Sequence, residues 1–357
     1  MQINVYKETV FFKDDGFEFV VVFNRTIRLP EDGKVHALPP SLGPFPIHLV
    51  DDFKDKVPPE WVEHGGVFLP VHPREAMWLR FSGSTAAVKV AAGMINAVSG
   101  KPWDPKLIAG EGDVQDYMVA PSPQTWLDGF NTGAGVIKQF VGMALGMGYT
   151  VEGQITGEEK FGGIQLLVVP PKPGKILERL KGVMRGMTLG DNEFNFSSMD
   201  GMKSCNGYSA PSVMRSYQPQ TRLTKGAQVG LAAGGEMKQK IYPDPHGLDT
   251  WDQDKTGRLY VHMINAEMYQ QITGKMPPAL PQSAQDYLKA NGAWFDLADG
   301  QMGDVTASKE LAGVKTVAGK DKEHGFEGQQ DDSPVEEKNV MTYPMPAGSV
   351  PVRNGKW

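Results

Sequence analysis

The sequence predicts a mainly β protein, either a large β-sandwich or a distorted barrel with a few short helices, which is an α+β fold leaning to β. Short apolar runs recur between glycine and proline residues along much of the chain, and this spacing is typical of sandwiches and barrels. The 357 residues also include 42 Gly and 27 Pro, more than a globular chain usually contains. This excess favours turns over long helices.

The first thirty residues predict a hairpin. Residues 3–12 are rich in β-branched and aromatic side chains, and residues 13–16 (KDDG) carry a turn signal. In residues 17–29, apolar side chains then fall on one side of a period-two pattern, as a strand with one buried face requires: Phe17, Phe19, Val21, Phe23, Ile27 and Leu29. We therefore expect one strand on each side of the KDDG turn.

The other expected elements follow from the same rules. Apolar runs predict strands at residues 67–71, 76–81, 86–91, 95–98, 117–120, 136–141, 164–169 and 258–263. Helical spacing or a capping residue predicts helices at 175–187, at 283–290, from near Asn265, and within 308–317.

The chain is expected to form one β-rich core domain over residues 1–298. Within it, residues 175–233 are interpreted as a helix followed by a long loop excursion. Residues 299–338 are dense in Lys, Glu, Asp and Gly, which predicts a polar linker. Residues 339–357 are expected to be a C-terminal extension or a returning strand.

Charge and cysteine content exclude several classes of partner. The net charge is −6, and Lys and Arg are dispersed without a basic tract, which argues against a nucleic-acid partner. Cys205 is the only cysteine, so one chain can form neither a disulfide nor a thiolate metal cage. No window reaches the ~18 apolar residues of a spanning helix, and the first residues lack the apolar core of a signal peptide. We expect a soluble cytoplasmic protein without membrane insertion.

Residues 242–251 (YPDPHGLDTW) supply the catalytic candidates, which are Asp244, His246 and Asp249. Carboxylates beside an imidazole can position and deprotonate water. The same stretch is rich in Pro and Gly, however, and Asp244 and Asp249 could equally cap its turns.

A calcium loop is the nearest match to a metal site. Asp252, Asp254 and Thr256 occupy its first three oxygen-ligand positions and Gly257 its sixth. Met263 stands where the loop needs a bidentate Glu. Calcium is therefore disfavoured relative to a solvated turn, and no cofactor is predicted.

Aromatic residues suggest a sugar-type ligand site, because flat rings stack on sugar faces and indole keeps an N–H for hydrogen bonding. The ligand-binding candidates are Trp126, Asp128, Tyr242 and Trp251. The apolar runs around the tryptophans favour a second interpretation, in which these rings are core anchors.

Several motifs together resemble a family of uncharacterised bacterial proteins. They are EAMW at 75–78, INAVSG at 95–100, WLDGF at 126–130, LGMGYTVEGQITGE at 145–158 and IYPDPHGLDTWD at 241–252. The resemblance extends over residues 5–320 and departs at Ala144, where relatives tend to have Pro. It implies no established activity, so it transfers no catalytic role.

The leading hypothesis is a non-catalytic binding or self-assembling structural protein, a homo-oligomer whose loops contact an unknown ligand. It rests on the failure of triad, metal-cage and phosphate-loop patterns. The alternative is a hydrolase-type enzyme that uses residues 244–252, and the sequence leaves open whether the protein is an enzyme.

Overall fold

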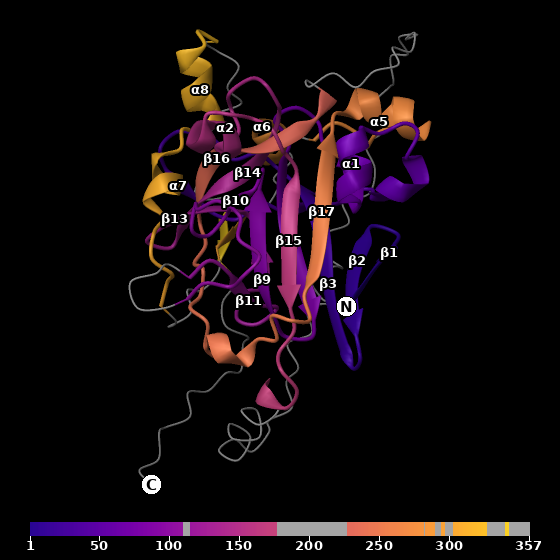
Figure 1. The fold of residues 1–357 in the computed structure, drawn as a ribbon. Helices are drawn as coiled ribbons and strands as arrows, with labels where there is room; N and C mark the ends of the chain where they lie inside the picture. Colours follow the sequence, from indigo (N-terminus) through magenta and orange to yellow (C-terminus); the bar gives the residue numbers. More distant parts are fainter. Residues whose placement is uncertain are drawn as a thin grey trace, which may run out of the picture.

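The computed structural model describes residues 1–109, 115–176, 227–281, 283–289, 294–296, 303–326 and 340–342. Two large β-sheets pack against each other, with short helices at their edges and ends (Figure 1). The predicted mainly β fold is confirmed in its sandwich form.

The larger sheet has ten strands and follows the order β1-β2-β3-β8-β14-β16-β4, with β5, β12 and β13 paired to β3, β8 and β14. Its pairs are antiparallel except β4 with β16. The strands are β1 (Gln2–Tyr6), β2 (Thr9–Asp14), β3 (Phe17–Thr26), β4 (Val35–His36), β5 (Ser41–Pro44), β8 (Ala76–Gly83), β12 (Trp126–Leu127), β13 (Gly129–Gly133), β14 (Val136–Ala144) and β16 (Val229–Lys238).

The smaller sheet has seven strands in the order β10-β9-β15-β17-β7-β6, and β11 pairs with β9. The strands are β6 (His48–Leu49), β7 (Val67–Pro70), β9 (Ala86–Ala92), β10 (Ile95–Asn96), β11 (Met118–Ala120), β15 (Ile164–Val169) and β17 (Gly257–Ile264). A separate parallel pair joins β18 (Trp294–Asp296) to β19 (Val340–Thr342).

The helices are short and begin at caps that the sequence predicts in three cases. The side chains of Asn265, Ser283 and Ser308 each accept a hydrogen bond from a backbone N–H three residues later. The helices are α1 (Pro59–His64), α2 (Val151–Thr156), α5 (Ala266–Thr273), α6 (Ala284–Lys289), α7 (Lys309–Gly313) and α8 (Val317–Glu323), with 3₁₀ turns η1 (Val50–Phe53) and η3 (Leu248–Thr250).

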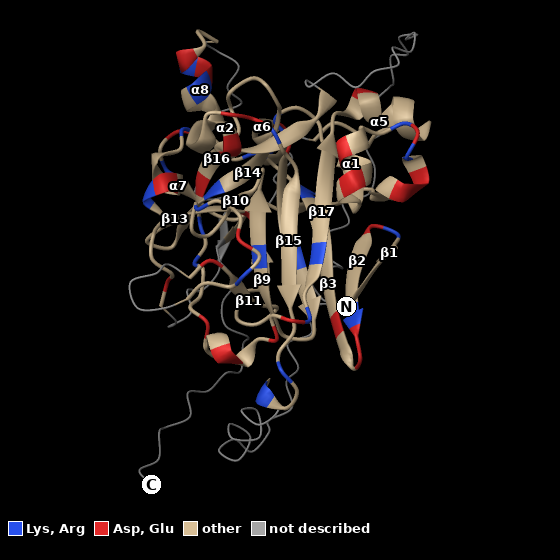
Figure 2. Ribbon diagram, in the orientation of Figure 1, with Lys and Arg blue, Asp and Glu red and all other residues tan. Residues whose placement is uncertain are grey.

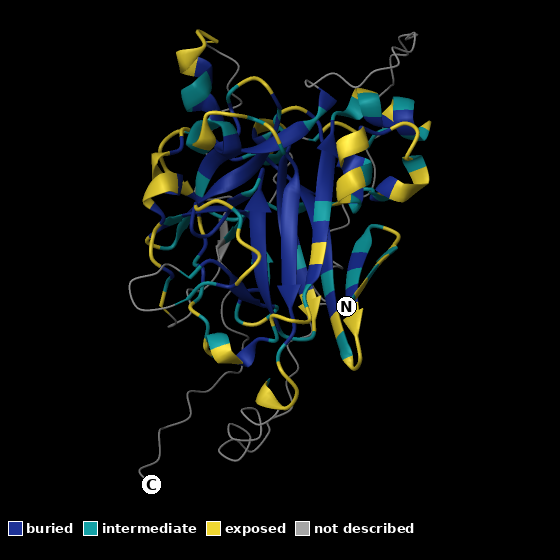
Figure 3. Ribbon diagram, viewed as in Figure 1, coloured by how far each residue is buried: buried dark blue, intermediate teal, exposed yellow. Residues whose placement is uncertain are grey.

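Alternating side chains supply the core between the two sheets. In β17, Leu259, Val261 and Met263 are buried in the main hydrophobic cluster, together with residues of β3 and β8 from the other sheet. Tyr260 and His262 point to the opposite face, because successive residues of a strand point to opposite sides. Strands β9 and β15 are buried along their whole length, whereas α1 is mostly exposed (Figure 3).

The expected strand over residues 3–12 is wrong, because the structure divides it into β1 and β2. The chain reverses between them at Lys7, whose φ is 52°. Neither Lys7 nor Glu8 is a usual turn residue, so local sequence gave no signal. The turn before Phe17 and the strand that follows it are confirmed.

The predicted polar linker over 299–338 also needs correction. Residues 303–326 form α7 and α8, and they bury Val305, Leu311 and Val317 against the ten-stranded sheet. Nη1 and Nη2 of Arg74 each donate to an oxygen of the Asp321 carboxylate at 2.7 Å. A few apolar residues and one buried ion pair therefore hold this polar segment in place.

The expected excursion over 175–233 ends earlier than predicted, since residues 229–233 already belong to β16. Most of the helix expected at 175–187 lies outside the described residues, as does Cys205. Among the helices that the structure describes, none combines the length and the apolar composition that crossing a bilayer requires.

Truncation of Phe23 tests the sandwich core. Its side chain is fully buried between the sheets on β3, so Phe23→Ala should lower the free energy of unfolding by about 3–5 kcal/mol. Tyr6→Ala, on the edge strand at 67% exposure, is the matched control. Urea denaturation measures both, and equal losses in the two variants would contradict the assigned core.

Candidate functional site

A hollow of about 820 Å³ lies at the outer face of the seven-stranded sheet, where α1 packs across β17. We call it the larger hollow. Trp61 and His64 of α1, and Tyr260 and His262 of β17, contribute rings to its wall. The loop between α2 and β15 (157–163, the α2–β15 loop) adds Phe161.

The four rings of α1 and β17 are stacked. Trp61 lies 4.4 Å from His262 and His64 lies 4.8 Å from Tyr260, measured between ring centroids, with interplanar angles of 19° and 4°. Tyr260 and His262 stack on each other at 4.3 Å. Residues two apart on a strand and three apart on a helix share a face, which is why two pairs from distant segments meet here.

Burial sets the protonation state of the stack. His262 is 2% exposed and its Nε2 lies 3.0 Å from the carbonyl oxygen of Gly65. Burial lowers the pKa of His262 to about 3, so the ring is neutral near pH 7 and donates from Nε2. Burial raises the pKa of Tyr260, whose hydroxyl donates to the Phe161 carbonyl at 3.3 Å.

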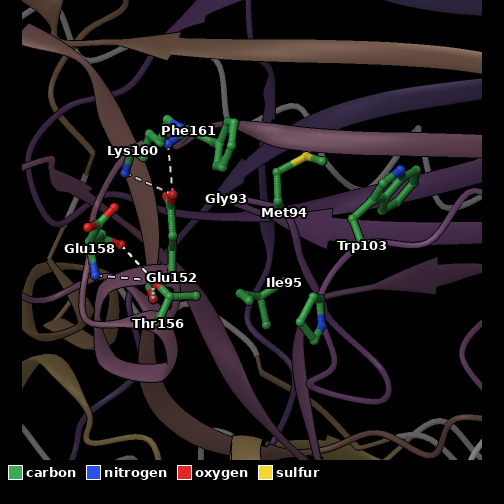
Figure 4. Close-up of a pocket in the computed structure, with 10 residues that line it drawn as sticks. Gly93, Met94, Ile95, Trp103, Glu152, Thr156, Glu158, Lys160 and Phe161 are labelled. Carbon is green, nitrogen blue, oxygen red and sulfur yellow. Dashed lines mark hydrogen bonds between the residues drawn. The ribbon is translucent and has the colours of Figure 1, made fainter.

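A second hollow of about 340 Å³, the smaller hollow, lies on the other side of the α2–β15 loop. Met94 and Trp103 lie on one side of it, and Glu158 and Lys160 on the other (Figure 4). Lys160 and Phe161 line both hollows. The two sites therefore adjoin at these residues.

The side chain of Glu152 holds the α2–β15 loop through hydrogen bonds to its backbone. Its buried carboxylate accepts hydrogen bonds from the backbone N–H groups of Lys160 at 2.8 Å, Phe161 at 2.7 Å and Gly162 at 2.9 Å. Figure 4 shows the first two of these bonds. A β-carbon at Gly93, in the turn between β9 and β10, would come within 2.3 Å of this carboxylate, so the close approach of the Glu152 side chain of α2 requires glycine there.

Glu159 fixes the other side of the loop. Its carboxylate accepts hydrogen bonds from the N–H groups of Gly146, Gly148 and Thr150 and from the Thr150 hydroxyl. Burial acts to raise the pKa of Glu159, but these hydrogen bonds outweigh it and hold that pKa below its ordinary value. Both glutamates therefore hold backbone in place.

The rim of the larger hollow carries charges of both signs. Asp55, Glu60 and Glu63 lie on the side of α1, where acidic residues mark the helix in Figure 2. Lys56 donates to the carbonyl of Ile272. Lys160 lies over the ring of Phe161 at 5.2 Å.

The predicted catalytic residues lie elsewhere and hold turns together. Oδ2 of Asp244 accepts from the Tyr117 hydroxyl at 2.7 Å and from Trp251 Nε1 at 2.8 Å, and its Oδ1 accepts from the N–H of His246 at 2.7 Å. Asp249 is exposed and pairs with Lys175. The contacts of Asp244 match the turn-capping alternative, whereas Asp249 pairs with a residue 74 positions away. The hydrolase hypothesis stays a prediction.

The calcium candidates form a turn before β17. The N–H of Asp254 donates to Asp252 Oδ1 at 3.3 Å, and Thr256 directly precedes the strand. Within the part of the chain that the structure describes, no group of three or more His, Cys, Asp and Glu side chains is arranged to hold a metal ion.

The predicted ligand-binding residues have structural contacts. Asp128 is buried and accepts from Gln239 at 2.7 Å. Trp251 is 1% exposed, so its ring faces are covered. Trp126 and Tyr242 are linked through Gln124, which donates to the carbonyl of Trp126 and accepts from the N–H of Tyr242.

Sequence reasoning missed His64, Phe161, Tyr260 and His262 as site residues. The usable signal was the alternation in residues 257–264, which places Tyr260 and His262 on one face. The position of α1 over that face had no comparable signal.

Comparison of the chain with protein-family models, curated proteins and solved structures gives no match. The function proposed below therefore rests on the geometry of the two hollows.

Replacing Glu152 tests the anchoring of the loop. Glu152→Gln replaces one acceptor oxygen of the carboxylate by an NH₂ group, which cannot accept hydrogen bonds from the backbone N–H groups that it faces. We therefore expect a loss of about 1–3 kcal/mol in the free energy of unfolding. Glu158→Gln is the control, since that side chain is exposed. Urea denaturation that found the two variants equally stable would contradict the anchoring role.

The neutral His262 predicts acid sensitivity. Its folded pKa lies below the ordinary 6.5, so the unfolded chain takes up the proton first and stability falls as the pH drops below that value. From pH 7 to pH 5 this group alone removes about 2 kcal/mol. His262→Phe should flatten the pH dependence of stability by that amount, whereas Leu280→Ala, at a side chain that is 75% exposed and cannot titrate, should keep the wild-type slope. An unchanged slope in His262→Phe would refute the assignment.

Proposed function

We propose that the protein is a non-catalytic binding protein and that its ligand site is the larger hollow together with the adjoining smaller hollow. The observation that carries the proposal is a space of about 820 Å³ walled by stacked rings and rimmed by polar side chains. Ligand pockets usually measure roughly 300–1,000 Å³ and combine apolar walls with a few polar groups.

Rigid walls support a binding role. Glu152 and Glu159 hold the α2–β15 loop by hydrogen bonds to its backbone and to neighbouring backbone. The ring stack holds α1 against β17. A preformed site spends less binding free energy on ordering side chains and loops.

Three of the ionisable groups that line the hollows make structural contacts, which supports a binding role for this site. The carboxylate oxygens of Glu152 and Glu159 already accept hydrogen bonds from backbone donors, and His262 is held neutral with its Nε2 bound to Gly65. A general base needs a lone pair that faces its substrate, and backbone donors already engage the carboxylate oxygens of Glu152 and Glu159.

We also propose a cytoplasmic location, a homo-oligomeric state and the lack of a nucleic-acid partner. The single cysteine supports the location, and the acidic net charge without basic tracts argues against a nucleic-acid partner. Sedimentation of the purified protein as a monomer at all concentrations would remove the homo-oligomer from the proposal.

Ligand-observed NMR with a library of small polar compounds tests the proposed site. Compounds that bind the wild type should bind Phe161→Ala at least about tenfold more weakly, because a ring shared by both hollows is lost. Tyr242→Ala is the matched control in the ligand site that the sequence suggested. Binding that survives Phe161→Ala and is lost in Tyr242→Ala would overturn the proposal.

A further inference from the structure

We infer that the ligand is a neutral oligosaccharide that passes from the larger hollow into the smaller one across Phe161. This inference rests on the proposed binding function and names the class of ligand that fits the same site. Four features support it: the rings, the mixed polar rim, the balance of charge and the two adjoining spaces.

Partly exposed rings lie where sugar units would pack. Phe161 and Tyr260 are half-buried and His64 is exposed in the larger hollow, and Trp103 is half-buried in the smaller one. The C–H face of a pyranose is flat and apolar, so it packs on an aromatic ring. The fully buried Trp61 and His262 instead support the rings nearer the solvent.

The rim offers both donors and acceptors within reach of these rings. Glu60, Glu63 and Glu158 provide carboxylate oxygens, Lys160 provides an ammonium group, and Gln228 lines the same larger hollow. A hydroxyl group both donates and accepts hydrogen bonds. A ligand rich in hydroxyl groups can therefore use every member of this mixed set.

The distribution of charge argues for a neutral ligand. Lys160 stands where the two hollows meet, so a cation that crossed this point would be repelled. Asp55, Glu60 and Glu63 on the rim of the larger hollow would repel an anion. Only a neutral molecule meets no like charge along this path.

The two spaces set a minimum length. Each hollow has its own aromatic residues, and Phe161 borders both. A monosaccharide can occupy only one hollow. We therefore expect affinity to rise from monosaccharides to trisaccharides.

Isothermal titration of the full chain with neutral trisaccharides is the direct test. The probes are cellotriose, maltotriose, xylotriose, mannotriose and triacetylchitotriose, with trigalacturonate as the anionic and deacetylated chitotriose as the cationic comparison. We expect at least one neutral trisaccharide to bind, about tenfold or more tightly than its monosaccharide and than the charged comparisons.

Variants then place the sugar. Trp103→Ala should weaken binding of the trisaccharide by about tenfold and leave the affinity for the monosaccharide as in the wild type. Glu158→Gln changes an exposed side chain of the same hollow and should also weaken binding of the trisaccharide. Unlike Trp103, this side chain does not pack on the core, so the second variant tests the site without disturbing the fold. Trp126→Ala, outside both hollows, should match the wild type.

The outcomes separate the inference from the proposed function. Binding of the charged sugars alone, or neutral-sugar binding insensitive to both Trp103→Ala and Glu158→Gln, overturns the inference. Failure of every sugar, while other library compounds bind and respond to Phe161→Ala, overturns the sugar class and leaves the binding function standing. Failure of all compounds overturns both.

Discussion

The alternation of side chains along β17 is the constraint on which the fold and the site both depend. One set of residues, Leu259, Val261 and Met263, faces the core between the sheets, and the intervening Tyr260 and His262 face α1. A shift of one residue in the pairing of β17 would exchange the two sets. The same register therefore builds the hydrophobic core and presents the rings of the larger hollow.

Glu152, which is buried, and Glu159, which is half-buried, give the site a fixed shape. Glu152 and Glu159 come from one continuous stretch of chain, and each carboxylate binds several backbone N–H groups. Buried charge is costly unless hydrogen bonds compensate it. The α2–β15 loop supplies the donors to Glu152, and the segment before α2 supplies the donors to Glu159. These acidic residues hold the surrounding backbone in position.

Much of the fold could be predicted from sequence because its signals are local. Apolar runs between Gly and Pro marked strands such as β9 and β15, and Asn265 and Ser308 marked helix starts. The turn at Lys7 and the packing of residues 303–326 had no local signal. The first uses a non-glycine residue with positive φ, and the second depends on Arg74, which lies about 250 residues from its partner Asp321 in the chain.

The site was harder to predict because it is assembled from distant segments. Trp61 and His262 meet only after α1 packs on β17, and a short helix after two prolines gave no indication of that position. Residues 244–252 attracted attention because a His and several carboxylates are adjacent in sequence. In the structure Asp244 holds two aromatic side chains and a turn, which matches the turn-capping interpretation of this residue.

The most direct test of the proposed ligand site is two-dimensional NMR of the labelled protein during titration with a compound that binds it. If the ligand binds in the two hollows, the shifted signals will cluster at His64, Lys160, Phe161 and Tyr260. Shifts confined to residues 244–252, with the α2–β15 loop and α1 unchanged, would contradict it.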